Sequence, residues 1–245
     1  MCGIVGYLGE KDSLDIILNG LKRLEYRGYD SAGIAVYNGS TIACCKSKGK
    51  ISKLEKSLSK RKNLKGGLGI GHTRWATHGE PNNANAHPQF SNSNKLCLVH
   101  NGIIENYSTI KQKLVKEGFT FKSETDTEVL VNLIEYIKTK EDVKLGEAVQ
   151  IALNQVIGAY AIAVIDNDKP DEIVVAKLGS PLCIGVGDDE YFIGSDVTPF
   201  IEYTKNVVYL EDGELAIIRN HKDTIFRNIE NDKIISPTVN KLELS

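Results

Sequence analysis

From residue 159 onward this chain is a succession of short apolar segments, and this feature limits the possible folds more than any other. Six such segments follow one another, separated by turns rich in Gly, Asp and Asn: 159–166, 173–177, 182–187, 191–195, 207–210 and 215–219. Short apolar runs bounded by turn residues are typical of β-strands. Because turns this short join antiparallel neighbours rather than βαβ units, the pattern predicts antiparallel sheets.

The first half of the chain contributes most of the helices. Apolar residues recur with helical spacing in five segments, and Thr125 or Asp126 can cap the fourth. Further strands are expected around these helices, two of them joined as a hairpin by Asn38-Gly39. We therefore expect one domain of sandwiched sheets flanked by helices. The helices are predicted at 12–24, 51–60, 107–116, 125–138 and 145–156, and the strands at 2–8, 31–37, 41–45, 68–73 and 96–101.

Composition excludes several classes of function. The chain has 245 residues and a formal net charge of −2, so nucleic-acid binding is disfavoured. No segment is long and apolar enough to span a membrane, and no secretory signal is visible. The five cysteines form neither C-x-x-C pairs nor an even set, which argues against a disulfide framework and a zinc site. These observations predict a cytoplasmic protein.

Cys2 directly follows the initiator methionine and opens an apolar run. Removal of Met1 would give Cys2 both a thiol and a free α-amine. The pKa of an α-amine is about 7.7–8.0, so a useful fraction is neutral near pH 7 and accepts a proton. One residue thus supplies a nucleophile and its own base. The alternative is a small apolar residue at the start of a buried strand.

A second polar cluster follows the strand predicted at 68–73. The planar guanidinium of Arg74 can bind a carboxylate through two hydrogen bonds. Thr77 and His78 follow closely in sequence and could complete a carboxylate-binding site. The alternatives are a surface ion pair for Arg74 and a core anchor for Trp75. A metal site built from histidines of this region lacks the helical H-x-x-x-H spacing and a nearby carboxylate pair. The histidines in question are His72, His78 and His87.

Two further clusters complete a set of binding groups. Asn101 and Gly102 place an amide side chain beside a backbone N–H, which suits an oxyanion hole; a type I′ hairpin turn is the alternative. Asp126 opens a predicted helix as a cap, and its charge also suits a ligand ammonium group. A thiol nucleophile, a cation, an anion and an oxyanion hole together indicate an amidase whose substrate carries both a carboxylate and an ammonium group. Glutamine is an amide of this kind.

The motifs that carry this chemistry resemble those of a known family. Cys2-Gly3-Ile4-Val5-Gly6 resembles the start of the N-terminal-nucleophile glutamine amidotransferases. Within that family, several longer runs resemble the branch that transfers ammonia to fructose 6-phosphate: 23–33, 72–81, 85–88, 100–106 and 123–129. The resemblance implies an α+β fold, an αββα sandwich of two antiparallel sheets between helical layers. It also implies a glutaminase domain over 1–239, with 240–245 beginning a linker to two sugar-isomerase domains.

The resemblance further implies roles for single residues, without any cofactor or metal. Cys2 attacks the side-chain amide of L-glutamine, and Asn101 with Gly102 stabilises the oxyanion. Asp126 holds the amino group of the substrate, and the full-length enzyme is expected to be a homo-oligomer. The substrate carboxylate is assigned to Arg74 and Thr77 with His78 nearby, and Trp75 to the loop that covers the site. Two alternatives stay open: an N-terminal-nucleophile hydrolase for another amide, and a regulatory module of the same fold without activity.

Overall fold

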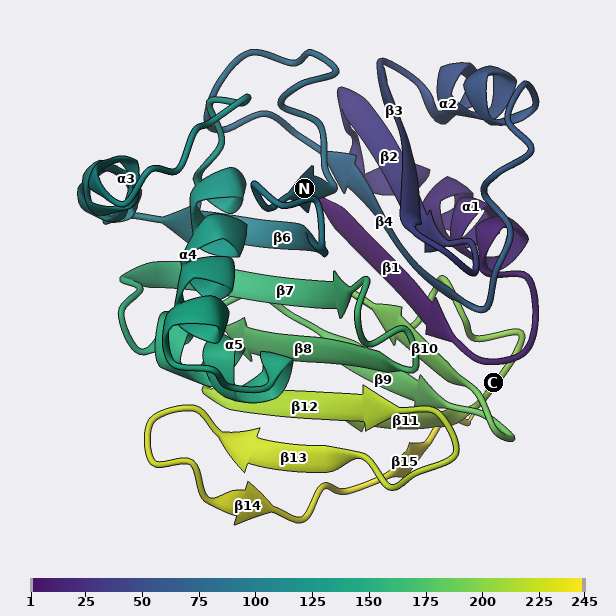
Figure 1. Cartoon of the computed structure of the whole chain (residues 1–245). Coiled ribbons are helices and arrows are strands. Elements are labelled where there is room, and N and C mark those ends of the chain that lie inside the picture. Colours follow the sequence, from purple (N-terminus) through teal and green to yellow (C-terminus); the bar gives the residue numbers. More distant parts are fainter. Residues whose placement is uncertain (1, 244–245) are drawn as a thin grey trace.

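The computed structural model describes residues 2–243, and its centre consists of two antiparallel sheets packed face to face (Figure 1). The first sheet has eight strands, with the N-terminal strand in its interior. Their spatial order is β15 (Asn240–Lys241), β11 (Asn206–Tyr209), β9 (Cys183–Val186), β10 (Tyr191–Gly194), β1 (Gly3–Leu8), β4 (Leu68–Arg74), β2 (Ser31–Tyr37) and β3 (Ile42–Lys48).

The second sheet has seven strands, and β6 and β7 form its longest pair. Their register places Asn101 opposite Ala161 and Gly102 opposite Tyr160. The order in this sheet is β14 (Ile234–Ile235), β13 (Ile225–Asn228), β12 (Glu214–Arg219), β8 (Glu172–Leu178), β7 (Gly158–Asp166), β6 (Leu96–Ile104) and β5 (Gln89–Phe90).

Helices cover the outer face of each sheet and make the fold four layers deep. The eight-stranded sheet carries α1 (Ser13–Arg23) and α2 (Ile51–Leu58), and a short 3₁₀ helix, η1 (Glu25–Arg27), follows α1. The seven-stranded sheet carries α3 (Tyr107–Lys116), α4 (Asp126–Lys140) and α5 (Leu145–Leu153) (Figure 1). The αββα sandwich expected from the sequence is therefore confirmed.

Strand β1 shows why the central strands are apolar along their whole length. Ile4 and Leu8 face the core between the two sheets, whereas Val5 and Tyr7 face the core beneath α1. Successive side chains of a strand point to opposite faces, and here both faces are covered. Each fully buried aliphatic side chain contributes about 1.5–3 kcal/mol to stability. The packing on both sides fixes β1, and with it the position of Cys2.

The Asn-Gly pair of β6 differs from the expected strand end. The strand does not stop at Asn101 but continues to Ile104, so the hairpin-turn interpretation of this pair is wrong. Gly102 adopts φ 119°, and a Cβ there would lie 2.1 Å from the carbonyl oxygen of Ala159. Only glycine fits this strand position, because the φ disfavours other residues and a neighbouring backbone occupies the space.

The C-terminal part of the chain contains strands that the sequence did not reveal. Strands β13 to β15 were not expected, and α5 ends three residues before the predicted Val156. Strand β15 pairs with β11, and the N–H of Leu242 donates to the carbonyl of Lys205 at 2.8 Å. Part of the predicted linker therefore extends the eight-stranded sheet. Leu244 and Ser245, also assigned to that linker, lie outside the described residues.

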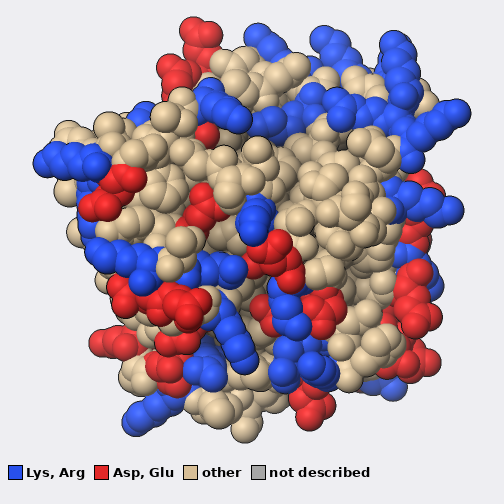
Figure 2. Space-filling view, viewed as in Figure 1, with Lys and Arg blue, Asp and Glu red and all other residues tan. Residues whose placement is uncertain are grey.

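Basic side chains are unevenly spread over the surface. Figure 2 shows Lys and Arg gathered at the upper right, where Figure 1 places α2. Only one acidic residue, Glu55, occurs between residues 48 and 65, the segment that contains α2. The small net charge therefore conceals a local basic cluster. Its exposed members are Lys48, Lys50, Lys53, Lys56, Lys60, Arg61, Lys62 and Lys65.

No helix within residues 2–243 combines the length and apolar character needed to cross a membrane.

Candidate active site

Most of the predicted site residues line one cavity of about 330 Å³ beside the start of β1. This volume is at the lower end of the range of small-molecule sites, about 300–1,000 Å³. The residues come from both sheets, from the segment after β4 and from the first turn of α4. They are Cys2, Arg74, Trp75, Thr77, His87, His100, Gly102, Ile103, Asp126 and Thr127.

The Cys2 thiol is held by the backbone that follows β4. The N–H of Trp75 donates to Sγ at 3.1 Å, and Sγ lies 3.6 Å from the carbonyl oxygen of Trp75. The Cys2 carbonyl accepts from Asn101 Nδ2 at 3.1 Å and from Arg27 Nη1 at 3.2 Å. Both the side chain and the backbone of Cys2 are thus fixed by hydrogen bonds.

Burial raises the pKa of the Cys2 thiol, while the Trp75 N–H and the positive charge of Arg74 oppose that shift. The resting group at neutral pH is therefore the thiol, and a nucleophilic attack needs a base to remove its proton. The expected base is the α-amine of Cys2. The removal of Met1 on which it depends concerns a residue outside the described part of the chain.

Arg74 is the last residue of β4 and is 3% exposed. Its guanidinium donates to the carbonyl oxygens of His78 and Glu80, the latter at 3.4 Å, and so closes the loop that follows the strand. It is not the surface ion pair that was the alternative. Burial lowers the pKa of Arg74, and Asp30, Cys2 and Asp126 oppose this shift. A buried guanidinium with acidic neighbours remains charged.

The loop over residues 75–88 is held by hydrogen bonds near both of its ends. Asp30 accepts the N–H of Ala76 at 2.7 Å, and Lys46 Nζ donates to the carbonyls of Ala84 and Pro88. The Trp75 side chain is 55% exposed, so it is not the core anchor that was its alternative. It stands at the surface beside the cavity, where a covering role remains a prediction.

Thr77 and His78 have different surroundings. Thr77 is exposed and lines the cavity. The ring of His78 instead packs edge-on against Tyr107, with 5.0 Å between the centroids, and is not among the lining residues. The backbone of His78 reaches the site through its hydrogen bond to Arg74. Its imidazole therefore has no place in the cavity of this structure.

Asp126 binds the end of β6 rather than capping its own helix. The cap of α4 is Thr125, whose hydroxyl accepts the N–H of Glu128 at 3.2 Å. Asp126 Oδ2 accepts the N–H of Ile104 at 2.8 Å, and the residue is 4% exposed. The choice of Asp126 as cap is wrong. Its carboxylate lines the same cavity as the Arg74 guanidinium, so one pocket contains both charges.

Three buried histidines lie together at the cavity, and two of them, His87 and His100, line it. His72 and His87 stack with centroids 4.2 Å apart, and Thr127 Oγ1 bonds both His87 Nε2 and His100 Nδ1. Burial lowers the pKa of each, to about 3 for His72. Stacked neutral rings of this kind do not converge on a metal ion. Residues 2–243 contain no group of three or more His, Cys, Asp or Glu that could hold one.

Sequence reasoning left the supporting residues without a role. Arg27, which binds the Cys2 carbonyl, is paired with Asp196 at 2.6 Å, and Asp30 holds the loop after Trp75. Both belong to the run 23–33, which carries a family resemblance but no predicted residue role. The available signal was its polarity between two apolar segments. The partner Asp196 follows β10 and is distant in sequence, so no local pattern indicates it.

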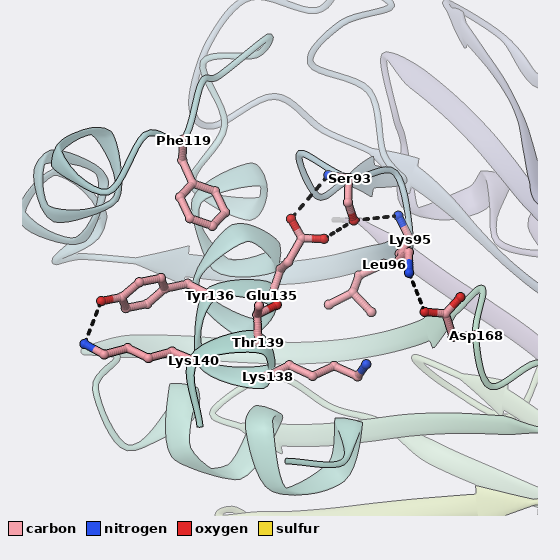
Figure 3. A pocket seen from close by; sticks show the side chains of 10 residues that line it. All are labelled: Ser93, Lys95, Leu96, Phe119, Glu135, Tyr136, Lys138, Thr139, Lys140 and Asp168. Carbon is pink, nitrogen blue, oxygen red and sulfur yellow. Dashed lines mark hydrogen bonds and ion pairs between the residues drawn. The ribbon is translucent and has the colours of Figure 1, made fainter. Parts of the chain in front are cut away.

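A larger cavity, of about 480 Å³, lies between α4 and the segments that carry Ser93, Lys95 and Asp168 (Figure 3). Its polar side chains bond one another: Lys95 pairs with Asp168 at 2.7 Å, and Lys140 donates to Tyr136 at 2.9 Å. It shares no residue with the Cys2 cavity. Size alone does not identify the site of chemistry, because this cavity contains no cysteine and its charged side chains already have partners within the protein.

A sandwich of two antiparallel sheets between helices, with a cysteine just before an interior strand and one cation and one anion lining the cavity beside it, is the arrangement of an N-terminal-nucleophile amidotransferase. Residues 59–238 match the family profile described as a glutamine amidotransferase domain. The match covers 180 of the 245 residues, and the chain belongs to this family.

The chain is also similar to curated proteins along its full length. It is 55% identical over 245 residues to a glutamine–fructose-6-phosphate aminotransferase (isomerizing) of Bacteroides thetaiotaomicron, covering 100% of this chain and 40% of that protein. The protein of the same name from Thermococcus kodakarensis is 46% identical over 99% of this chain and 40% of its own length. The chain thus spans about two fifths of the curated relatives that it matches.

Solved structures share the fold. Glutamine phosphoribosylpyrophosphate amidotransferase from B. subtilis, complexed with ADP and GMP, superimposes with a TM-score of 0.78 at 31% identity, covering 94% of this chain and 50% of that one. A glutamine aminotransferase class-II domain protein from Silicibacter pomeroyi gives a TM-score of 0.64 at 17% identity, over 93% of this chain and 99% of that one. The second likeness concerns the fold alone.

Proposed function

We propose that this chain hydrolyses the side-chain amide of L-glutamine, with Cys2 as the nucleophile. The observation that carries the proposal is the placement of Arg74 and Asp126 around the cavity that contains the Cys2 thiol. A free amino acid presents a carboxylate and an ammonium group on one carbon. A site with one cation and one anion can bind both of these groups, whereas an ordinary peptide amide carries neither group next to the reacting bond.

The reaction proceeds through a thioester. The α-amine of Cys2 takes the thiol proton as Sγ attacks the amide carbon, and the C–N bond then breaks as that proton passes to the leaving ammonia. Water attacks the thioester next, releasing glutamate and restoring the thiol. Because burial disfavours a resting thiolate, deprotonation and attack are coupled.

The tetrahedral intermediate carries a negative oxygen that needs donors. Asn101 and Gly102 sit side by side on β6, next to the start of β1. The Asn101 amide already directs Nδ2 toward Cys2, and glycine at 102 leaves the backbone beside the cavity uncovered. These two donors fit the oxyanion role, which is worth about 10²–10³ in rate for each donor.

The same proposal extends to a longer protein. The curated relatives named for the transfer to fructose 6-phosphate are about two and a half times as long as this chain. We assign this chain the role of their ammonia-producing part, followed by sugar-isomerase domains that use the ammonia, in a cytoplasmic homo-oligomer. Trp75, exposed beside the cavity, is placed to cover it while ammonia passes on.

The direct test is glutamate release from L-glutamine by the protein with its initiator methionine removed. Cys2→Ala is expected to abolish turnover and to leave the thermal midpoint of unfolding within a few degrees, because the thiol is small. Cys44→Ala, a half-buried cysteine outside the cavity, is the matched control and retains activity. Activity in Cys2→Ala, or L-asparagine as the better substrate, would refute the proposal.

A further inference from the structure

A hydrogen-bonded chain connects a buried histidine to the backbone of the nucleophile. His72 Nε2 lies 2.8 Å from Asn101 Oδ1, and Asn101 Nδ2 donates to the carbonyl oxygen of Cys2 at 3.1 Å. The three residues come from β4, β6 and the start of β1, so the chain crosses from one sheet to the other. His72 is fully buried and Asn101 is 8% exposed.

The partners along this chain determine where each hydrogen lies. A backbone carbonyl only accepts, so the end of the Asn101 amide that faces Cys2 must be the NH₂ group. The oxygen of the amide then faces His72 and also only accepts. The ring nitrogen opposite it, Nε2, must therefore carry the proton, which leaves Nδ1 as the bare nitrogen. Within residues 2–243, His72 Nδ1 has no hydrogen-bond partner of ordinary geometry, although the backbone of His100 lies close enough to the ring to favour its protonated form, less strongly than Asn101 does.

We propose that His72, as the Nε2–H tautomer, is a positioning residue that keeps the Asn101 amide turned with its NH₂ group toward the nucleophile. A freely rotating amide would turn its oxygen toward Cys2 part of the time. An oxygen there repels the Cys2 carbonyl and repels the oxyanion as it forms. The proposal deepens the proposed glutaminase function and rests on it for the catalytic consequence.

The surroundings of His72 suit this role. The ring stacks on His87 at an interplanar angle of 23°, which prevents rotation about its last bond. Burial is the main influence that disfavours a positive charge on the ring, and His100 and Arg74 act in the same direction. The ring therefore stays neutral and keeps one tautomer over the whole physiological range. A group that neither turns nor titrates is suited to hold another group in one orientation.

Two variants separate positioning from packing. His72→Gln keeps a donor at the reach of Nε2, whereas His72→Phe keeps a flat ring without any donor. We expect kcat for glutamine hydrolysis to fall by up to about 100-fold in His72→Phe with KM nearly unchanged, and to recover in large part in His72→Gln. His221→Phe, at an exposed histidine, serves as the control and retains the parent kcat. Equal kcat in His72→Phe and the parent protein would overturn the proposal.

A second measurement needs neither activity nor a variant that folds. Long-range ¹H–¹⁵N correlation spectra of the ¹⁵N-labelled protein report which ring nitrogen of each histidine carries the proton. The expected result is a proton on Nε2 of His72 at every pH from 6 to 8. A proton on Nδ1, or a titration of His72 in that interval, would overturn the proposal. An inactive parent protein would refute the proposed function, while these spectra would still decide how Asn101 is held.

Discussion

The thiol of Cys2 and the backbone of Trp75 contact each other twice, through the N–H of Trp75 at 3.1 Å and its carbonyl oxygen at 3.6 Å. The Cys2 thiol thus contacts the backbone of the first residue of the loop that borders the cavity. The side chain of that residue is exposed, while its backbone holds sulfur. A movement of the loop would therefore change the covering of the site and the position of Sγ together.

Selective labelling tests the special position of the Cys2 thiol. We expect a glutamine-like electrophile to modify Cys2 and none of the other four cysteines, because only Cys2 lines the cavity. Burial raises the pKa of all five thiols, to about 12 for Cys44, so the place of Cys2 in the cavity and its own α-amine set it apart, not a lower thiol pKa. Peptide mapping after labelling, with and without excess glutamine, is the measurement. A label mainly at Cys44 or Cys45, or one that glutamine does not prevent, would contradict the account.

Asp126→Asn separates binding of the substrate from the support of β6. The amide oxygen of asparagine still accepts the Ile104 N–H, but the negative charge is lost. Binding of glutamine should weaken by about 1.5–3 kcal/mol, as expected for a lost charge-assisted contact. Hydrolysis of a glutamine analogue without the α-amino group should change much less. The ratio of kcat/KM for the two substrates is the measured quantity.

The matched control for this variant is Asp15→Asn. Both aspartates occupy the first turn of a helix, but Asp15 is exposed on α1 and does not line the cavity. Asp15→Asn should leave both substrates unaffected. Equal losses for the two substrates in Asp126→Asn would show that its carboxylate does not bind the ammonium group.

Gly102→Ala should destabilise the fold severely. The added Cβ would meet the Ala159 carbonyl at 2.1 Å while the backbone keeps φ 119°. We expect a loss of about 3 kcal/mol or more in the free energy of unfolding, since neither backbone can yield without breaking the β6–β7 pair. Gly118→Ala is the control: its φ is also positive, at 91°, but nothing lies within 4 Å of the new Cβ. Its cost should be only about 1–2 kcal/mol. Similar denaturant midpoints for the two variants would contradict the steric argument.

The buried histidines should make stability fall in mild acid. His72 has a pKa of about 3 in the folded protein, against about 6.5 in an unfolded chain. Between these values the unfolded state binds more protons, so the stabilisation is complete above pH 6.5 and is lost as pH falls. At pH 5 the loss from His72 alone is about 2 kcal/mol. Urea unfolding at pH 7.5 and pH 5 should show this loss, and His72→Gln should reduce it by about that amount. An identical loss in the variant would show that His72 is not responsible.

Periodicity predicted the fold where an element is long or regularly spaced. The predicted bounds of the helix over Tyr107–Lys116 and of the six predicted strands between residues 159 and 219 agree with the structure to within one or two residues. Apolar residues recur about every 3.6 residues in the helix and form continuous runs in the strands. Strands β14 and β15 have only two residues each and exist through their pairing with neighbours. Such edge pairing depends on tertiary context, which a local pattern does not contain.

The sequence could predict that Cys2, Arg74 and Asp126 lie at one cavity, because the chemistry expected of the site calls for these residue types; their roles remain predictions. The site was not predictable where a role depends on an orientation. His78 is next to the site in sequence, yet its ring turns to Tyr107. Asn101-Gly102 has the composition of a turn, yet pairing with β7 keeps it in a strand. Both outcomes follow from contacts with segments that are distant in sequence.

The covalent intermediate offers the most direct test of the central claim. Acid quenching within milliseconds of mixing with L-glutamine, followed by intact-mass measurement and peptide mapping, would trap the acyl-enzyme. The account predicts an added glutamyl group on the peptide that begins with Cys2, which disappears as glutamate is released and is absent in Cys2→Ala. Glutamate release at full rate without any adduct on Cys2, or an adduct on another residue, would contradict it.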